Sequence, residues 1–283
     1  MPEDATVLCV TAGGTREGVT SVSSLDEHAR SQVILSALGA TGRVEVNDLA
    51  QRLAVSTVTI RKDLGALEQR AVLRRVRGGA VAAPLVDEGS FEVRLGVRRA
   101  EKTAIARAVA PLVQDGDVIA LDSSTSCHYL AQELLDRRSL VVITNSMPTA
   151  TLFSERSEAT VLVPGGIVRR SARSVVGLIG DVLAGRGRID KGFIGAHAVS
   201  AERGLLDMAL EEAQAKQYFA AHCAQLFGLV DSSKFGSFSL HTATPVADIT
   251  ALYTDGAADP ALVAALERAG ARVHRVDVTE QQR

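Results

Sequence analysis

From residue 91 onwards this chain of 283 residues alternates short apolar runs with longer amphipathic stretches, and this alternation constrains the fold more than any other feature. A short apolar run between polar residues or glycines is typical of a buried strand, whereas apolar residues three and four apart indicate a helix. Strands that alternate with helices favour a mostly parallel α/β sheet covered by helices. The expected strands are residues 117–122, 140–145, 160–165, 191–196, 226–231 and 249–254, and the expected helices lie near 101–113, 127–136, 209–222 and 260–269.

Several of these expected strands end in polar residues or glycines, and ligands in open α/β sheets bind beyond the carboxyl ends of the strands. The run Asp-Ser-Ser-Thr-Ser at 122–126 leads into a helix, whose free N–H groups and neighbouring hydroxyls can hold a phosphate. A turn that only caps the helix is the alternative, and the sequence leaves it open. The candidate ligand-binding residues are Asp122, Ser123, Ser124, Thr125, Ser126, Thr144, Asn145, Gly165, Gly166 and Lys234.

Other charged residues are weaker candidates for this site. Lys234 follows a strand and could neutralise a phosphate, although an exposed loop lysine is an equal alternative. Lys102 and Lys216 lie on expected helices, where we expect solvated side chains, and the same holds for Glu211 and Glu212.

The segment before residue 82 has a different pattern. It predicts a helix over about 26–40, an extended piece at 42–46 and a second helix from Asn47 or Asp48 to near Ala54. Ser56 can cap a third helix, which carries Ile60, Leu64, Leu67 and Ala71 on one face.

A short basic hairpin follows the third helix. In residues 72–77 the set Val72, Arg74 and Val76 alternates with the set Leu73, Arg75 and Arg77, and Gly78-Gly79 supplies a tight turn. Three helices followed by such a hairpin describe a winged helix-turn-helix. Residues 25–81 hold nine basic and six acidic residues, although the whole chain has a formal net charge of −2.

The basic residues of this segment cluster where a DNA-binding surface would lie. Six of the nine fall between Arg61 and Arg77, on the third helix and the hairpin. A merely solvated helix face is the alternative, but it does not account for this clustering. The expected DNA-binding residues are Ser56, Thr57, Thr59, Arg61, Lys62, Arg75 and Arg77.

The stretch VSTVTIRKDLGALEQ at 55–69, followed by RRVRGGA at 74–80, resembles the DeoR family of bacterial transcription regulators. Lys62 stands where that family more often has Arg. The resemblance extends over roughly residues 25–278. Its further landmarks are Lys102, the 122–126 loop, Thr144-Asn145, Gly165-Gly166, 190–196, Gly204-Leu205, Glu212, Lys216, 231–236 and Thr254-Asp255.

The resemblance implies an effector domain similar to ribose-5-phosphate isomerase that senses a phosphorylated sugar or related metabolite. The family's loop commonly has Gly and Thr where this chain has Ser124 and Ser126, which implies an anion site of altered detail. We therefore expect a cytoplasmic regulator, most simply a repressor of a carbohydrate or related metabolic operon. Its expected partners are double-stranded operator DNA and the effector. A two-fold operator favours a homo-oligomer, either dimer or tetramer.

The expected organisation is a tail at 1–24, the winged helix-turn-helix at 25–81, a linker at 82–90, the effector domain at 91–278 and a tail at 279–283. The alternative function is a sugar-phosphate isomerase-like enzyme with an accessory helix-turn-helix, for which Asp190, Glu211 or Glu212 could act as the base. No local motif assigns that role, so we expect no catalytic residues.

Composition excludes other classes of protein. The three cysteines are scattered without metal-ligand spacing, and the six histidines likewise show none, so we expect neither a disulfide framework nor a metal or other cofactor. No apolar run approaches the length of a membrane span, and the N-terminus lacks the basic start of a signal peptide.

Overall fold

The computed structural model of the chain describes residues 30–31, 33–34, 37–38, 43–69, 73–82, 90–179 and 188–278. The expected tails, most of the helix expected at 26–40 and most of the expected linker lie outside these residues. The described residues between 30 and 38 are helical.

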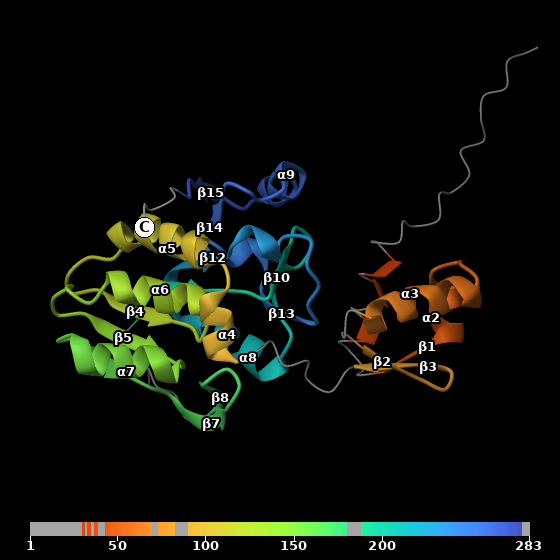
Figure 1. Cartoon of the computed structure of the whole chain (residues 1–283), viewed down its shortest axis with the longest axis horizontal. Helices are drawn as coiled ribbons and strands as arrows, with labels where there is room; N and C mark the ends of the chain where they lie inside the picture. The colour runs from red at the N-terminus through yellow and green to blue at the C-terminus, as the bar shows by residue number, and fades with distance from the viewer. Residues whose placement is uncertain are drawn as a thin grey trace, which may run out of the picture.

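The N-terminal part contains two further helices and a three-stranded antiparallel sheet (Figure 1). Strand β1 (Arg43–Glu45) leads into α2 (Val46–Arg52) and α3 (Thr57–Gln69), followed by the hairpin of β2 (Leu73–Val76) and β3 (Gly79–Ala82). Strand β3 pairs with both β1 and β2. The predicted hairpin and third helix are therefore confirmed. The predicted start of α2 at Asn47 or Asp48 is wrong, because Glu45 occupies the N-cap position and offers no side-chain hydrogen bond.

Helix α3 turns its apolar face inward, as its periodicity predicts. Ile60, Leu64 and Leu67 are each at most 1% exposed. Asp63 is also buried, and its carboxylate receives two hydrogen bonds from Arg30, at 2.8 Å from Nε and 3.1 Å from a terminal nitrogen. A buried carboxylate needs such a partner, so this pair joins α3 to the helical segment that contains Arg30.

The turn of the hairpin depends on its glycines. Gly78 has a φ of +84°, which favours glycine. A Cβ on Gly79 would lie 1.9 Å from the carbonyl oxygen of Val44, so β1 and β3 can pair at this register only around a glycine.

The larger part is built on a parallel seven-stranded sheet in the order β15-β14-β12-β9-β4-β5-β6 (Figure 1). The strands predicted from the sequence are confirmed, with small shifts at their ends. They are β4 (Val118–Leu121), β5 (Val141–Thr144), β6 (Thr160–Leu162), β9 (Ile189–Ile194), β12 (Cys223–Leu229) and β14 (Ala251–Asp255).

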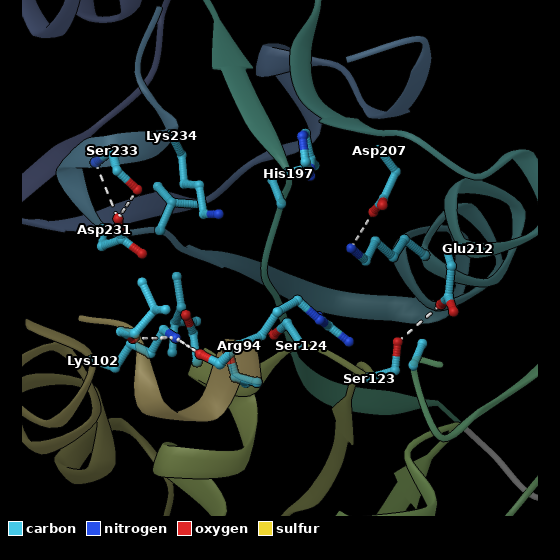
Figure 2. A pocket seen from close by; sticks show the side chains of 18 of the residues that line it. Arg94, Lys102, Ser123, Ser124, His197, Asp207, Glu212, Asp231, Ser233 and Lys234 are labelled. Atoms are coloured by element: carbon cyan, nitrogen blue, oxygen red, sulfur yellow. Dashed lines mark hydrogen bonds and ion pairs between the residues drawn. The ribbon is translucent and has the colours of Figure 1, made fainter. Parts of the chain in front are cut away.

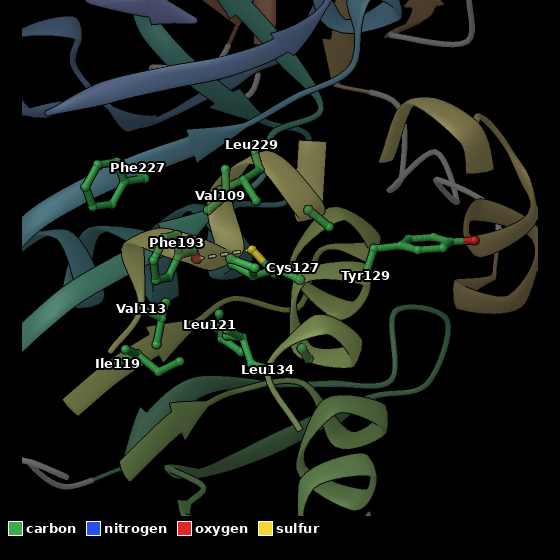
Figure 3. Close-up of a cluster of buried hydrophobic side chains, with 14 of the residues drawn as sticks. Val109, Val113, Ile119, Leu121, Cys127, Tyr129, Leu134, Phe193, Phe227 and Leu229 are labelled. Atoms are coloured by element: carbon green, nitrogen blue, oxygen red, sulfur yellow. Dashed lines mark hydrogen bonds between the residues drawn. The ribbon is translucent and has the colours of Figure 1, made fainter. Parts of the chain in front are cut away.

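Helices cover both faces of this sheet. Helices α5 (Arg99–Val109), α6 (Thr125–Glu133) and α7 (Met147–Arg156) pack on one face, where Leu121 and Phe193 contribute to the core (Figure 3). Helices α8 (Leu210–His222) and α9 (Pro260–Arg268) pack on the other, against Ala120 and Leu252 respectively. Successive strand residues thus face opposite helical layers, which explains why a central strand such as β4 is apolar along its whole length.

Several elements were not predicted from the sequence. They are α4 (Phe91–Gly96), α7, the hairpin of β7 (Gly165–Arg169) and β8 (Ser174–Ile179), the small sheet of β10 (Ala198–Ser200), β11 (Gly204–Asp207) and β13 (His241–Thr244), and the edge strand β15 (Val273–Val276). Among the described helices, none combines the length and apolar character that crossing a membrane requires. Cys127 and Cys223, the cysteines within the described ranges, are free thiols.

Candidate functional site

A cavity of about 210 Å³ opens where β4, β9 and β12 end at their carboxyl edge (Figure 2). Polar residues from six elements or the loops beside them converge on it, and they include both cations and carboxylates. The charged and hydroxyl residues of the lining are Arg94, Lys102, Ser123, Ser124, Thr125, Ser126, Asp207, Glu212, Lys216, Asp231, Ser233 and Lys234.

The loop after β4 forms one wall, and Asp122 holds it from beneath. Asp122 is fully buried, and its carboxylate accepts from the backbone N–H of Ser124 and of Gly195, each at 2.9 Å. A Cβ on Gly195 would lie 2.5 Å from the Ser124 side chain, so only glycine lets β9 approach this loop. Asp122 itself is not among the residues that line the cavity.

This loop leads into the first turn of α6. The Ser124 hydroxyl caps the helix by accepting from the Cys127 N–H at 3.2 Å. Among the described residues, the N–H groups of Thr125 and Ser126 have no acceptor, as is usual in a first helical turn. Both residues line the cavity, where the positive end of the helix dipole favours an anion.

Two lysines bring positive charge to the same cavity. Lys102 is only 5% exposed, and its ammonium donates to the carbonyls of Arg94 at 2.5 Å and Val97 at 2.7 Å, at the C-terminal end of α4. Burial lowers the pKa of Lys102 to about 8, partly offset by the nearby Asp231. Lys234 follows β12 and lines the cavity; its backbone N–H donates to the Asp231 carbonyl at 3.0 Å, and its ammonium has no acceptor among the described residues. The expectation of a solvated Lys102 is therefore wrong.

Lys216 reaches the cavity from α8 and lies between two carboxylates. Its ammonium is 3.2 Å from an Asp122 oxygen and forms a closer ion pair with Asp207. Burial alone would lower the pKa of Lys216, but Asp207 and Asp122 outweigh it and raise the pKa above its usual value. Lys216 is therefore a buried, charged residue and not the solvated one expected from the sequence.

Glu212 connects the cavity to the β7–β8 hairpin. One of its oxygens accepts from the Ser123 hydroxyl at 2.9 Å, and the other accepts from Ser174 and from Arg169, the latter at 3.3 Å. With 3% exposure Glu212 is buried, again contrary to the expectation for a helical carboxylate, whereas Glu211 is exposed as expected.

His197 follows β9 and forms another part of the lining. Burial lowers its pKa to about 4, and Lys234 and Lys216 contribute to the lowering. The imidazole is therefore neutral near pH 7 and can exchange hydrogen bonds with a ligand without adding charge.

The structure brings some of the predicted residues together and leaves others apart. The predicted residues Ser123, Ser124, Thr125, Ser126 and Lys234 all line the cavity. Thr144 is the last residue of β5 and Asn145 follows it; both are buried, and the Asn145 amide donates to the Val175 carbonyl at 3.2 Å. Gly165 and Gly166 lie in β7. None of these last four lines the cavity, because β5 and β7 lie away from the β4–β9–β12 edge.

Several residues that line the cavity were not predicted from the sequence. Asp207 ends β11 of the small sheet, which was not predicted, and His197 lies just beyond the strand predicted at 191–196. Arg94 comes from α4, also unpredicted. Polar residues after a predicted strand were the signal that could have found His197.

The winged part presents a separate polar surface. Ser56 caps α3 by accepting from the Thr59 N–H at 3.0 Å, and the two hydroxyls lie 2.9 Å apart. Arg61 and Lys62 are exposed on the next turn, while Thr57 is half-buried. Arg75 and Arg77 are exposed on the hairpin, and the Arg75 N–H donates to Glu68 of α3 at 2.8 Å. This bond fixes the hairpin beside the helix.

Comparisons with known proteins agree on one family. A profile described as "DeoR-like helix-turn-helix domain" matches residues 30–84, and one described as "DeoR C terminal sensor domain" matches residues 97–256. The chain is 32% identical to the HTH-type transcriptional regulator GolR of Listeria innocua, over 85% of this chain and 95% of that protein. It is 30% identical to the lactose phosphotransferase system repressor of Streptococcus mutans, over 80% of this chain and 91% of that one.

A solved structure also matches part of the chain, at low similarity. The ribose 5-phosphate isomerase A of Neisseria gonorrhoeae superposes with a TM-score of 0.37 at 12% identity, covering 49% of this chain and 53% of that one.

Proposed function

Because the chain belongs to the DeoR family of transcriptional regulators, we propose that it is a repressor of a carbohydrate or related metabolic operon, released or retained by a phosphorylated sugar or similar metabolite. Helix α3 and the β2–β3 hairpin bind operator DNA, and the cavity beside α6 binds the effector. The proposed units are residues 25–81 and 91–278, joined by 82–90.

The observation that carries the effector proposal is the convergence of three anion-binding features on one cavity. The first turn of α6 offers the N–H groups of Thr125 and Ser126, and Lys234 and Lys102 add ammonium groups. Backbone N–H groups at a helix start together with lysines are how proteins commonly hold phosphate.

The other end of the cavity suits hydroxyl groups. Asp207 and Glu212 line it, and His197 is neutral near pH 7 because burial lowers its pKa to about 4. A ligand with a phosphate at one end and hydroxyls at the other would match this polarity. The names of the relatives support the carbohydrate class, since one is a lactose phosphotransferase system repressor and another a putative aga operon transcriptional repressor.

The DNA-binding proposal rests on the exposed face of α3. Arg61 and Lys62 are exposed on the face opposite the buried stripe, at the end of the helix that Ser56 caps. Recognition helices contact base edges with their N-terminal residues. If Arg61 binds a guanine in bidentate fashion, Arg61→Ala reduces discrimination against random DNA by about 1–3 kcal/mol. A two-fold operator would require a dimer or tetramer of this chain.

The effector proposal is tested in two steps with the full chain. A thermal-shift screen of phosphorylated sugars and polyols identifies ligands, because a ligand that binds only the folded state raises its stability. Each hit is then titrated into the protein–operator complex. We expect Thr125→Ala and Lys234→Ala to bind operator as the wild type does and to lose the response to the effector.

Matched controls come from outside the cavity. Thr151→Ala removes an exposed threonine on α7, and Lys191→Ala removes a lysine from the amino-terminal half of β9. Both should respond normally. A normal response in Thr125→Ala and Lys234→Ala as well would place the effector site elsewhere.

The isomerase alternative has less support. Asp190 lies at the opposite end of β9 from the cavity and accepts from the Val118 N–H at 2.8 Å, while both oxygens of Glu212 already accept hydrogen bonds. The relatives that share about 30% sequence identity over most of the chain, such as GolR, are named as regulators or repressors. Turnover of a sugar phosphate by the purified protein would reverse this preference.

A further inference from the structure

Val58 is an apolar side chain in an unexpected place. It is the second residue of α3, and it is 70% exposed. The hydrophobic core of the winged part, as described, takes Ile60, Leu64 and Leu67 from this helix and does not include Val58. The Val58 side chain therefore does not contribute to the hydrophobic core of the described part of the chain.

The neighbours of Val58 on the helix surface are two cations and a glycine. At about 100° per residue, Arg61, Lys62 and Gly65 lie within roughly 60° of Val58 around the helix axis. Arg61 and Lys62 are exposed, and Gly65 leaves that face of the helix without a side chain one turn further on. This face of α3 can approach a polyanion closely, and Val58 lies at its N-terminal end.

Single exposed valines are ordinary on protein surfaces, so exposure alone decides nothing. The place of Val58 in the helix suggests a role, because the first turn of a recognition helix is the part that reaches base edges. In the major groove the C5-methyl of thymine is the apolar group that such a side chain can contact. Valine is also stiff at χ1, so little conformational freedom is lost on contact.

We propose that Val58 reads a thymine in each operator half-site by packing against its C5-methyl group. The proposal rests on the proposed binding of α3 in the major groove. It adds an apolar, base-specific contact to the polar and cationic residues of that helix, and it makes Val58 a determinant of sequence specificity.

The test removes the methyl group from the DNA and the side chain from the protein. An operator is first selected from a random duplex pool with the full-length protein. Each thymine is then replaced in turn by deoxyuracil, which pairs identically but lacks the C5-methyl. Affinities are measured for the wild type, Val58→Ala, Val58→Thr and a control, Val168→Ala, which trims an exposed valine on β7.

At one thymine per half-site we expect deoxyuracil to weaken wild-type binding about fourfold, equivalent to roughly 0.8 kcal/mol for one buried methyl group. Val58→Ala should bind the two DNAs equally at that position. Val58→Thr, which keeps one γ-methyl, should retain part of the difference, and Val168→Ala should behave as the wild type. Unchanged melting temperatures, expected for an exposed residue, show that the variants fold.

Two failures are distinguishable. If the pool yields an operator but no thymine shows a deoxyuracil effect that depends on Val58, the thymine contact is overturned while DNA binding stands. If no sequence is enriched over random DNA, the proposed DNA-binding function fails, and the thymine contact fails with it.

Discussion

At the scale of single residues, Lys102 is the cavity group whose charge is closest to changing near neutral pH. Its pKa is lowered to about 8 by burial, with Lys234 and Arg94 adding to the lowering and Asp231 opposing it. The pKa of Lys102 in the folded state therefore lies below its usual value of 10.5. Burying the charged ammonium lowers the free energy of unfolding below pH 8, and this loss of stability disappears as the pH rises toward 10.5.

A bound phosphate favours the charged form of Lys102, so binding takes up a proton above pH 8. We predict that effector affinity is nearly constant from pH 7 to 8 and then falls, by up to about tenfold per pH unit. Titration calorimetry across pH 7–9.5 measures this. Lys234→Ala should bind more weakly, with the fall in affinity moved to higher pH because Lys234 contributes to the lowered pKa of Lys102. Lys102→Met should bind more weakly with a flat profile. A flat wild-type profile contradicts the prediction.

A second residue, Lys216, is predicted to matter for stability. Lys216→Met would leave the buried carboxylates of Asp122 and Asp207 without their cation, which costs about 3–5 kcal/mol of unfolding free energy. Urea denaturation followed by far-UV circular dichroism measures the loss. Lys191→Met is the control, because its pair with Asp117 is more exposed and should cost about 1 kcal/mol or less. Equal losses of unfolding free energy in the two variants would show that the burial of Lys216 adds nothing to the stability that its ion pairs provide.

At the scale of elements, the β2–β3 hairpin is predicted to contact phosphates and not bases. Arg75→Ala and Arg77→Ala should each weaken binding to operator and random DNA alike, and should reduce the salt dependence by about one phosphate contact. The reason is that both side chains are exposed on a hairpin that the Arg75–Glu68 bond holds beside α3. Arg156→Ala, which removes an exposed arginine from α7, should change neither. Unchanged salt slopes in both hairpin variants would remove the hairpin from the DNA interface.

The same scale shows which elements a sequence can predict. Buried parallel strands such as β4 and β5 were predicted because every residue in them is apolar or small. Strand β15 was missed because His274 and Arg275 occupy the middle of an exposed edge, and β7 because it begins with two glycines. Isolated edge strands and short hairpins lack the continuous apolar run that marks a central strand.

The candidate site was predictable only in part, for a related reason. Loop residues 123–126 and Lys234 follow strands, so chain order alone placed them at the carboxyl edge. Lys102 and Lys216 were misjudged because residue type favours solvated helical lysines, whereas here carbonyls of α4 and two carboxylates give them buried partners. Such partners come from elements distant in sequence, and no local pattern reveals them.

At the scale of the whole molecule, the proposal requires that the cavity and the DNA surface influence each other. Thermodynamic linkage makes such coupling reciprocal, so the factor by which effector changes operator affinity equals the factor by which operator changes effector affinity. We predict a factor of about 5–150, the usual range for such coupling. Titrating effector into free protein and into protein saturated with operator measures the factor by which operator changes effector affinity. Titrating operator with and without effector measures the factor by which effector changes operator affinity.

A change at Glu212 can separate the coupling between cavity and DNA surface from effector binding itself. The Glu212 carboxylate joins Ser123 in the cavity wall to Arg169 and Ser174 of the β7–β8 hairpin. Glu212→Gln keeps the shape of the side chain and removes its charge, so the hairpin contacts weaken while the cations of the cavity remain. We expect effector binding within a few fold of the wild type and a coupling factor that moves toward one in both titrations. An unchanged coupling factor would show that the hairpin contact of Glu212 plays no part in communication between the cavity and the DNA surface.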